Sequence, residues 1–255
     1  GWALRRNPDS PLHRTAFRLA LGLALVAVPA QILSGDISAK HVAEHQPMKL
    51  AAAESLFVTQ TGAPLAVGGL PDEEAGELRY AIEIPSGLSF LAFADFDAEV
   101  AGLDQVDRSL WPPVAVVHVG FQIMVGCGFA MLGLVGLGGL AWLRGRKVPA
   151  RAPWCDRRYL TLAMLATPLG LIAIEAGWVV TEVGRQPWVI QGYMKTADAV
   201  TPMPQLVVPF TVFTLLYVFL GVVVVVLLKN HVMVTLPGDG DPAGGRRESA
   251  SGARS

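Results

Sequence analysis

Four long stretches of the chain consist mostly of apolar residues, and more polar segments separate them. A helix that crosses a membrane needs about 20 consecutive residues that are mostly apolar. The stretches that reach this length are residues 15–34, 113–143, 159–181 and 205–228. The pattern therefore predicts an all-α integral membrane protein with four transmembrane helices.

The polar segments differ in charge, and this difference predicts which side of the membrane each one faces. The connection RGRKVPARAPWCDRR is strongly basic, as is LRRNPDSPLHR near the start of the chain. Residues 36–111 instead hold thirteen acidic residues against four Lys or Arg. Because short cytoplasmic connections are enriched in Lys and Arg, we expect the basic segments inside and one long acidic loop outside, in the periplasm.

These expectations divide the whole chain. In order, the parts are a cytoplasmic connection (1–14), a helix (15–34), the outer loop (35–112), a helix (113–143), a basic cytoplasmic loop (144–158), a helix (159–181), an outer turn (182–204), a helix (205–228) and a cytoplasmic tail (229–255). In the outer loop, LAAAESLF predicts a helix, and RYAIEIPSGLSFLAF is apolar enough to pack on the membrane surface. The Gly-, Ser- and Arg-rich tail has almost nothing to bury, so we expect it to be disordered.

Composition supports the membrane class without identifying a function. Hydrophobic residues make up 52% of the chain, charged residues make up 16%, and the mean hydropathy is +0.45. These values favour a membrane protein over a soluble domain. The sequence does not begin with Met, and its first residues resemble a connection between spans, so we expect it to be part of a longer chain.

The segment EAGWVVTEVGRQPW places one carboxylate, Glu175, in the third predicted span and a second, Glu182, directly after its end. Glu175, Trp178 and Glu182 follow one another at spacings of three and four, so they lie on one face of a helix. An ionisable side chain at membrane depth costs a few kcal/mol and indicates a functional site. In an alternative interpretation, Glu182 reaches the membrane interface and Arg185 complements the helix dipole. The deeper Glu175 still needs a partner or a proton path.

The second predicted span contains HVGFQIMVGCGF, with several side chains that could serve a cofactor. The thioether of a methionine can bind heme iron, usually opposite a histidine. A single methionine on an apolar helix more often fills the core, so residue type does not distinguish Met124 from Met131. His118 could also be a ligand, although a single histidine at the interface is more often hydrogen bonded and structural.

The outer loop carries Lys49 and Glu54 in HQPMKLAAAESLF. Residues five apart on a helix do not face each other, so this spacing does not favour an ion pair. From the residue types alone, the two side chains could belong to an ordinary solvated face.

Three of these segments together resemble one known family, subunit I of the cytochrome bd type quinol oxidases. GDISAKHVAEHQPMKLAAAE resembles the start of its quinol-binding loop, FQIMVGCGF resembles its helix with an axial methionine, and EAGWVVTEVGRQPW resembles its segment around GRQPW. The segments occur in the family's order, with IEIPSGLSFLAF between the first and the second. The resemblance covers nearly everything except the tail and corresponds to the C-terminal half of the subunit, of the type with a short quinol loop.

The resemblance implies roles on the two central spans. Met124 would be an axial ligand of a low-spin heme b, and Glu182 would bind or closely approach the iron of a high-spin heme b. Arg185 would neutralise heme propionates, and Trp178 would pack between the hemes. Glu175 is expected to belong to the same cofactor-binding face.

In the outer loop, the resemblance implies that Lys49 and Glu54 form the quinol site, where the carboxylate accepts a quinol proton. Gln122 departs from the pattern, because well-known members carry an arginine two residues before the axial methionine. An uncharged amide cannot form the same ion pair with a propionate, so Gln122 is expected to alter the surroundings of the heme.

The activity implied is that of a respiratory terminal oxidase in the bacterial cytoplasmic (inner) membrane. It would oxidise quinol, reduce dioxygen to water and build a proton gradient without pumping. The implied cofactors are a low-spin heme b, a high-spin heme b, and a heme d or a third heme b in its place.

The implied partners are the N-terminal half of subunit I, which carries the axial histidines, then subunit II, a small single-span subunit and membrane quinone. No nucleic acid is expected to bind, and this segment alone is expected to be inactive. An alternative of another class is a heme-free helical membrane scaffold or a proton-coupled carrier, in which Glu175 and Glu182 relay protons.

Overall fold

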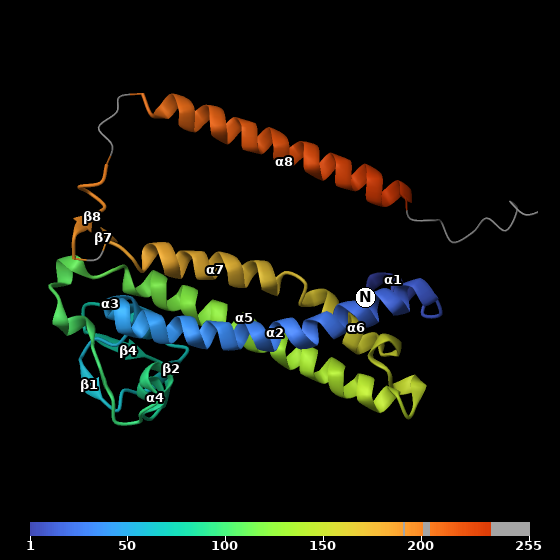
Figure 1. Ribbon diagram of the computed structural model, residues 1–255, viewed down its shortest axis with the longest axis horizontal. Coiled ribbons are helices and arrows are strands. Elements are labelled where there is room, and N and C mark those ends of the chain that lie inside the picture. The colour runs from blue at the N-terminus through green and yellow to red at the C-terminus, as the bar shows by residue number, and fades with distance from the viewer. Residues whose placement is uncertain (191, 201–204, 236–255) are drawn as a thin grey trace, which may run out of the picture. The chain divides into compact units, whose positions relative to one another are not determined.

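A computed structural model of the chain describes residues 1–190, 192–200 and 205–235, with side chains as far as residue 230. The chain divides into two units, Gly1–Val200 and Thr201–Ser255. In the first unit the helices are α1 (Trp2–Arg6), α2 (Pro11–His45), α3 (Pro47–Glu54), α4 (Gly87–Phe93), α5 (Val114–Gly145), α6 (Arg157–Leu165) and α7 (Leu169–Val183) (Figure 1). The second unit contains α8 (Val207–Thr235).

Four helical segments within the described residues are long and apolar enough to cross a membrane. They are Pro11–His45, Val114–Gly145, Arg157–Val183 and Val207–Asn230. This result confirms the prediction of a helical membrane protein with four spans. On which side of the membrane each connection lies stays a prediction.

The first span is longer than the hydrophobic pattern indicates. The helix α2 continues past residue 34 to His45, because the segment beyond the apolar stretch also favours a helix. Lys40 donates to the carboxylate of Asp36 one turn earlier, at 2.6 Å, a spacing that stabilises helices.

The third span consists of two helices rather than one. The helix α6 ends at Leu165, and α7 begins at Leu169. Pro168 lies between them, lacks a backbone N–H and disfavours helical geometry in the residue before it. Sequence analysis treated this stretch as a single helix.

The segment between α2 and α5, predicted as a long outer loop, is largely ordered into short elements. Besides α3 and α4, it contains the antiparallel pairs β1 (Gln60–Thr61) with β6 (Glu99–Val100), β2 (Leu65–Val67) with β5 (Ile82–Ile84), and β3 (Leu70–Asp72) with β4 (Glu77–Arg79), and the 3₁₀ turns η1 (Leu103–Gln105) and η2 (Arg108–Leu110). Their buried side chains form one core with the start of α5, including Val114 and Val117. The segment is therefore anchored to a membrane helix.

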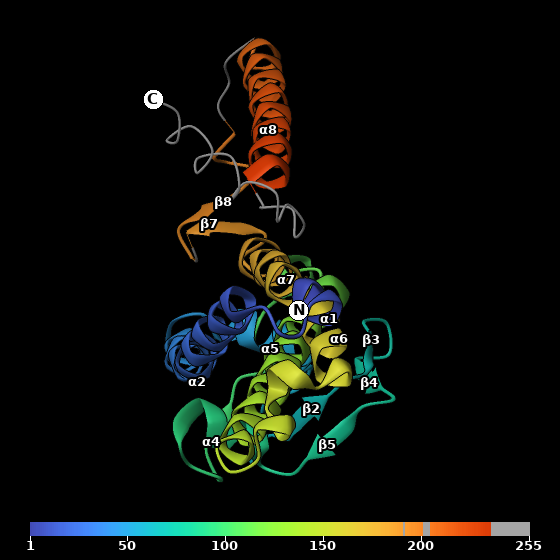
Figure 2. The ribbon, with the colours of Figure 1, turned by 90° about the vertical axis from the view of Figure 1, so that its right-hand side faces the viewer.

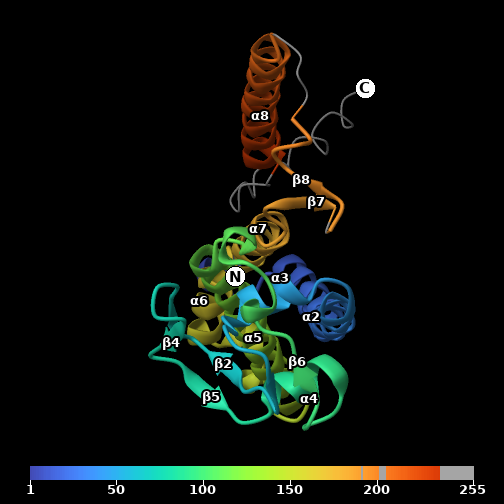
Figure 3. The same ribbon diagram turned by 90° about the vertical axis from the view of Figure 1, so that its left-hand side faces the viewer.

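Helix α5 lies at the centre of the first unit. Viewed from either end, α2 lies on one side of it and the β3–β4 hairpin on the other (Figures 2 and 3), and both contact it. Helix α7 packs along α5, and a β-carbon added at Gly120 would make ordinary contact with Val180, at 3.4 Å, and Val179, at 3.5 Å.

The remaining connections are short. The 3₁₀ turns η3 (Pro149–Arg151) and η4 (Pro153–Cys155) join α5 to α6, and the strands β7 (Trp188–Ile190) and β8 (Met194–Lys195) form a hairpin after α7. The helix α8 continues to Thr235, so residues 229–235 are helical, although they were assigned to the disordered tail. The rest of that tail, residues 236–255, lies outside the described part of the chain.

Candidate functional site

Helix α3 carries the candidate quinol-site residues and is buried along its second half. Pro47 occupies the first turn, where its missing N–H costs nothing. Every residue from Leu50 to Glu54 is buried. Ser55 ends the helix in the left-handed conformation, with φ 54°, and the following backbone N–H groups bond back to Ala52 and Ala51. The last residue of the helix is therefore held inside the protein.

Glu54 is that last residue, and its side chain is only 5% exposed. Burial raises the pKa of its carboxyl group to about 7, while a hydrogen bond from the backbone N–H of Ala66 acts in the opposite direction. Its Oε2 has no hydrogen-bond partner among the described residues. Glu54 lines a pocket of about 180 Å³ together with Leu78 and Glu83, while its Oε2 is itself buried. A buried carboxyl group with a free oxygen and a pKa near neutrality is suited to proton transfer.

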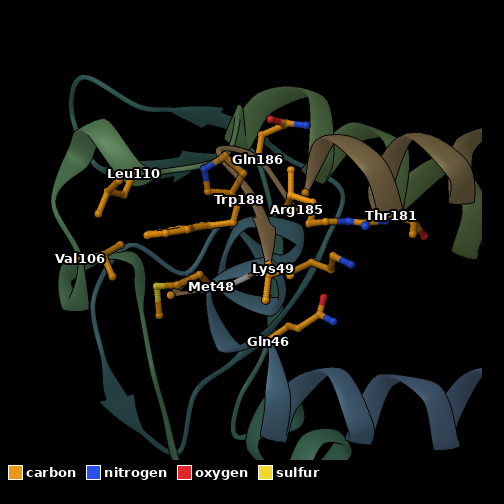
Figure 4. Close-up of a pocket in the computed structure, with 14 residues that line it drawn as sticks. Gln46, Met48, Lys49, Val106, Leu110, Thr181, Arg185, Gln186 and Trp188 are labelled. Atoms are coloured by element: carbon orange, nitrogen blue, oxygen red, sulfur yellow. The ribbon is translucent and has the colours of Figure 1, made fainter. Parts of the chain in front are cut away.

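Lys49 lies on the same helix but lines a different pocket, of about 610 Å³. Figure 4 shows Lys49 and Arg185 extending in the same direction in this pocket, with Trp188 forming part of its wall. Desolvation lowers the pKa of Lys49, the positive charge of Arg185 lowers it further, and Glu182 opposes both. Two cations therefore share one pocket, which suits an anionic ligand.

The two residues predicted to form one quinol site thus lie on different faces of α3. Lys49 lines the larger pocket and Glu54 lines the smaller one, as their spacing of five residues indicates. Their joint role in a quinol site stays a prediction.

The face of α7 that carries the carboxylates is exposed. Glu175 and Glu182 are both exposed, and Trp178 is 67% exposed. Arg185 donates to Glu182 Oε1 at 2.9 Å, so it forms an ion pair in addition to any effect on the helix dipole. Two carboxylates and an indole on an apolar span form a surface that fits a polar or metal-containing group better than lipid.

Met124 faces α7 and is partly buried. A β-carbon added to Gly177 would lie 3.1 Å from Met124 Sδ, so the sulfur atom rests against a glycine that directly precedes Trp178. The structure therefore brings the predicted axial methionine next to the helix that carries Glu182, as a site shared by α5 and α7 requires.

Gln122 contacts the segment between α2 and α5, residues 46–113, through both polar atoms of its side chain. This segment is called the outer segment, after the side of the membrane predicted for it. Its Nε2 donates to the backbone carbonyl of Ala66 at 2.9 Å, and its Oε1 accepts from the backbone N–H of Gly68 at 3.1 Å. The nearby His118 is completely buried, with Nδ1 2.8 Å from the carbonyl oxygen of Ala53 and Nε2 3.2 Å from that of Gly68. The interpretation of His118 as a hydrogen-bonded residue agrees with this geometry.

Three further residues take part in these contacts although they were not predicted from the sequence. Trp188 lines the larger pocket, Glu83 lines the smaller one, and Gly68 bonds to Gln122 and His118. Trp188 lies within the quoted GRQPW segment, so that motif could have indicated it. The contacts of Gly68 and Glu83 depend on the pairing of short strands, for which the sequence gives no comparable sign.

Comparison with known proteins identifies the family. The family model described as "Cytochrome bd terminal oxidase subunit I" matches residues 1–235. The chain belongs to this family. The resemblance found in its sequence segments is thereby confirmed.

Relatives in Bacillus subtilis (strain 168) share much of the sequence. The chain is 42% identical over 219 residues to a putative cytochrome bd menaquinol oxidase subunit I, covering 86% of this chain and 48% of the relative. It is 34% identical over 243 residues to a cytochrome bd ubiquinol oxidase subunit 1, covering 90% of this chain and 50% of the relative. The chain thus spans about half the length of the curated relatives it matches.

A solved structure of a bd oxidase has a fold similar to that of this chain. The bd oxidase from Geobacillus thermodenitrificans aligns with a TM-score of 0.75 at 37% sequence identity, covering 92% of this chain and 52% of that chain. Family membership and four apolar helices identify the chain as a multi-pass protein of a bacterial membrane.

Proposed function

We propose that the chain forms the C-terminal half of subunit I of a quinol oxidase in the bacterial cytoplasmic membrane. The observation that carries this proposal is Glu54, a buried carboxyl group with a free oxygen at a pocket, in a chain whose relatives are named as quinol oxidases. The heme-free scaffold or carrier is the weaker proposal, because the chain belongs to the oxidase family and its relatives are named as quinol oxidases.

In this proposal, Glu54 accepts a proton from a quinol hydroxyl group at Oε2. A proton acceptor works best when its pKa lies near the working pH, and burial raises the pKa of Glu54 to about 7. The Ala66 N–H, which bonds to the carboxyl group, favours the charged form that must be present before the proton arrives. The same burial then favours the neutral acid.

The smaller pocket has the volume for a single six-membered ring. Its volume is about 180 Å³, and an apolar cavity of about 150 Å³ is known to bind benzene. We therefore assign the quinol ring to the pocket lined by Glu54, Leu78 and Glu83.

The larger pocket has a different role in the proposal. Lys49 and Arg185 both line it, and their positive charges suit carboxylates such as heme propionates. In this arrangement Lys49 lies on the other face of α3 and does not contact the quinol ring. Substitution of Lys49 would therefore first weaken the binding of heme propionates in the larger pocket.

The residues of α5 and α7 fit heme. Met124 offers a thioether, which rests against Gly177. Glu182 offers an exposed carboxylate, and Arg185 beside it offers a positive charge. These are donor and charge-balancing groups of the kinds that heme requires. Met124 would hold a low-spin heme b and Glu182 a high-spin heme b, with Trp178 and Glu175 on the same face. When bound, hemes supply electron carriers and the centre where dioxygen is reduced to water.

The proposal extends to the assembled enzyme. Subunit II, the N-terminal half of subunit I and a small single-span subunit complete it, together with a heme d or a third heme b. In the proposal, quinol releases its protons outside, and the protons that form water are taken up from inside. The reaction is therefore electrogenic without proton pumping. This segment alone is inactive in the proposal, because the other axial ligands lie elsewhere.

The test compares two glutamates of the segment between α2 and α5, one inside and one outside the pocket, in the full-length, assembled oxidase. Glu54→Gln keeps the shape of the side chain but removes the proton acceptor, so quinol-driven oxygen consumption should fall by at least about 100-fold. Oxygen consumption driven by a chemical reductant that bypasses quinol should persist. Glu99→Gln is the matched control and should keep wild-type quinol oxidation, because Glu99 lies in the same segment, is exposed and does not line this pocket. Wild-type quinol oxidation in Glu54→Gln would refute the assignment.

A further inference from the structure

Two side chains of α5 bind the same short piece of the outer segment. His118 and Gln122 are four residues apart on α5 and therefore lie on one face of the helix. Gln122 bonds to Ala66 and Gly68, and His118 contacts the carbonyl group of Gly68. The amide of Gln122 pairs with this stretch as a neighbouring strand would, with one donor and one acceptor. The backbone of residues 66–68 is thus fixed to a membrane helix.

The same contacts reach Glu54 from two directions. The backbone N–H of Ala66 bonds to the Glu54 carboxyl group, while its carbonyl group accepts from Gln122. On the other side, His118 Nδ1 lies 2.8 Å from the carbonyl oxygen of Ala53, the residue that directly precedes Glu54. These neighbours form a circuit that runs from Glu54 through Ala66, Gln122, Gly68, His118 and Ala53 back to Glu54, in which a neutral His118 donates to one of its two carbonyl neighbours at a time.

The geometry of α3 explains why a histidine is useful at this point. The last carbonyl groups of a helix have no partner within the helix. The carbonyls of Ala51 and Ala52 accept from the backbone beyond the helix end, whereas that of Ala53 accepts from the imidazole of His118. Because a neutral imidazole has one N–H, it donates to Ala53 or to Gly68 at any moment.

Gly68 is needed for its backbone conformation rather than for space. Its φ is +71°, and a β-carbon there would meet nothing within 4 Å. This left-handed conformation turns both its N–H and its carbonyl group toward α5, where they meet Gln122 and His118.

We propose that His118 and Gln122 are positioning residues for Glu54. They hold the end of α3 and the 66–68 backbone at a fixed separation, so that one carboxyl oxygen receives the Ala66 N–H and the buried Oε2 is left without a partner among the described residues. This inference rests on the proposed role of Glu54 as the quinol-proton acceptor. It gives Gln122 a role in the outer segment instead of the contact with heme that was predicted for this position.

The experiment uses Gln122→Met and His118→Phe in the full-length assembled oxidase, since both replacements keep the approximate size of the side chain and remove its hydrogen bonds. We expect the kcat of quinol oxidation to fall between about 10- and 100-fold. The pH–rate profile should shift, because the Ala66 N–H is no longer held against Glu54. The heme absorbance bands and reductant-driven oxygen consumption should stay at wild-type values.

Two controls separate positioning from general stability. Gln105→Met removes the bond that Gln105 donates to Thr59 Oγ1, which lies in the same outer segment but outside the circuit, and should leave the profile unchanged. Gln122→Glu keeps the shape of the side chain and the acceptor for Gly68 but loses the donor to Ala66. It should therefore show a defect at least as strong, because a carboxylate oxygen would then face the carbonyl oxygen of Ala66.

The outcomes distinguish this inference from the proposed function. If Glu54→Gln is active, the proposed function fails. If Glu54→Gln is inactive while an assembled Gln122 or His118 variant keeps the wild-type rate and pH profile, only the positioning inference fails. The positioning inference also fails if Gln122→Met, His118→Phe and Gln122→Glu all prevent assembly of the oxidase, because the two residues then serve only to hold the fold together.

Discussion

Glu54 combines burial with a free oxygen atom, and the two properties together give it a distinctive response to pH. Two titratable residues are linked to its surroundings: His118, which contacts the carbonyl group of the preceding residue, and Glu83, which lines the same pocket. Lys49 lies on the same helix but lines the other pocket. The pKa of about 7 arises mainly from desolvation.

The pH dependence of folding follows from this pKa. The folded pKa lies above the ordinary value of 4.5, so the folded state binds more protons than the unfolded state between pH 4.5 and 7. The contribution of Glu54 to stability is therefore greatest below this range and falls by about 3 kcal/mol as the pH rises through it. Thermal unfolding of the purified full-length oxidase as a function of pH should show this loss. Glu54→Gln should remove it, and an identical pH dependence in both proteins would contradict the assignment.

Met124 is the residue whose proposed role is easiest to isolate. Met124→Leu keeps the volume of the side chain but removes the sulfur donor, so the assembled oxidase should lose its low-spin heme b or convert it to another spin state. Absorbance spectra of the purified enzyme would detect either change. Met131→Leu is the matched control on the same helix, and an unchanged low-spin spectrum in Met124→Leu would exclude the ligand.

At the scale of elements, the helix α7 can be tested through its carboxylates. Glu182→Gln leaves a weak neutral donor and Glu182→Ala leaves none, so each should lower the content of high-spin heme b, with the larger loss in Glu182→Ala. A carboxylate that only reaches toward the interface would behave in the opposite way, because its removal would be neutral or stabilising. Heme content per purified complex distinguishes the two, and full retention in Glu182→Ala would rule out iron binding.

The sequence predicted the helices well because the length of an apolar stretch is a local property. It also predicted that Lys49 and Glu54 do not face each other, since five residues at about 100° each turn the second side chain well away from the first. The break between α6 and α7 was foreseeable from Pro168, but the apolar pattern hid it.

The strands of the outer segment and the contacts of Gln122 could not be predicted in the same way. Each strand is two or three residues long, which is too short for an alternating pattern to appear. Gln122 meets Ala66 and Gly68 from more than fifty positions away in the sequence. Such a contact depends on how the outer segment folds back onto α5.

At the scale of the whole molecule, the chain presents much apolar surface and a row of carboxylates on α7. The apolar residues on its helices suit lipid and neighbouring helices, whereas Glu175 and Glu182 need a polar or metal-containing partner. Since the chain spans about half the length of its curated relatives, activity has to be measured in the full-length subunit within its complex.

The central claim is that this chain helps to pass electrons from quinol to heme through a site at Glu54. The most direct measurement is the reduced-minus-oxidised absorbance spectrum of the full-length complex, recorded with quinol and then with a strong chemical reductant. In the wild type, both should produce heme bands. In Glu54→Gln, the chemical reductant should produce the same bands and quinol should produce almost none. Absence of heme bands in the wild type, or equal reduction by quinol in both proteins, would contradict the account.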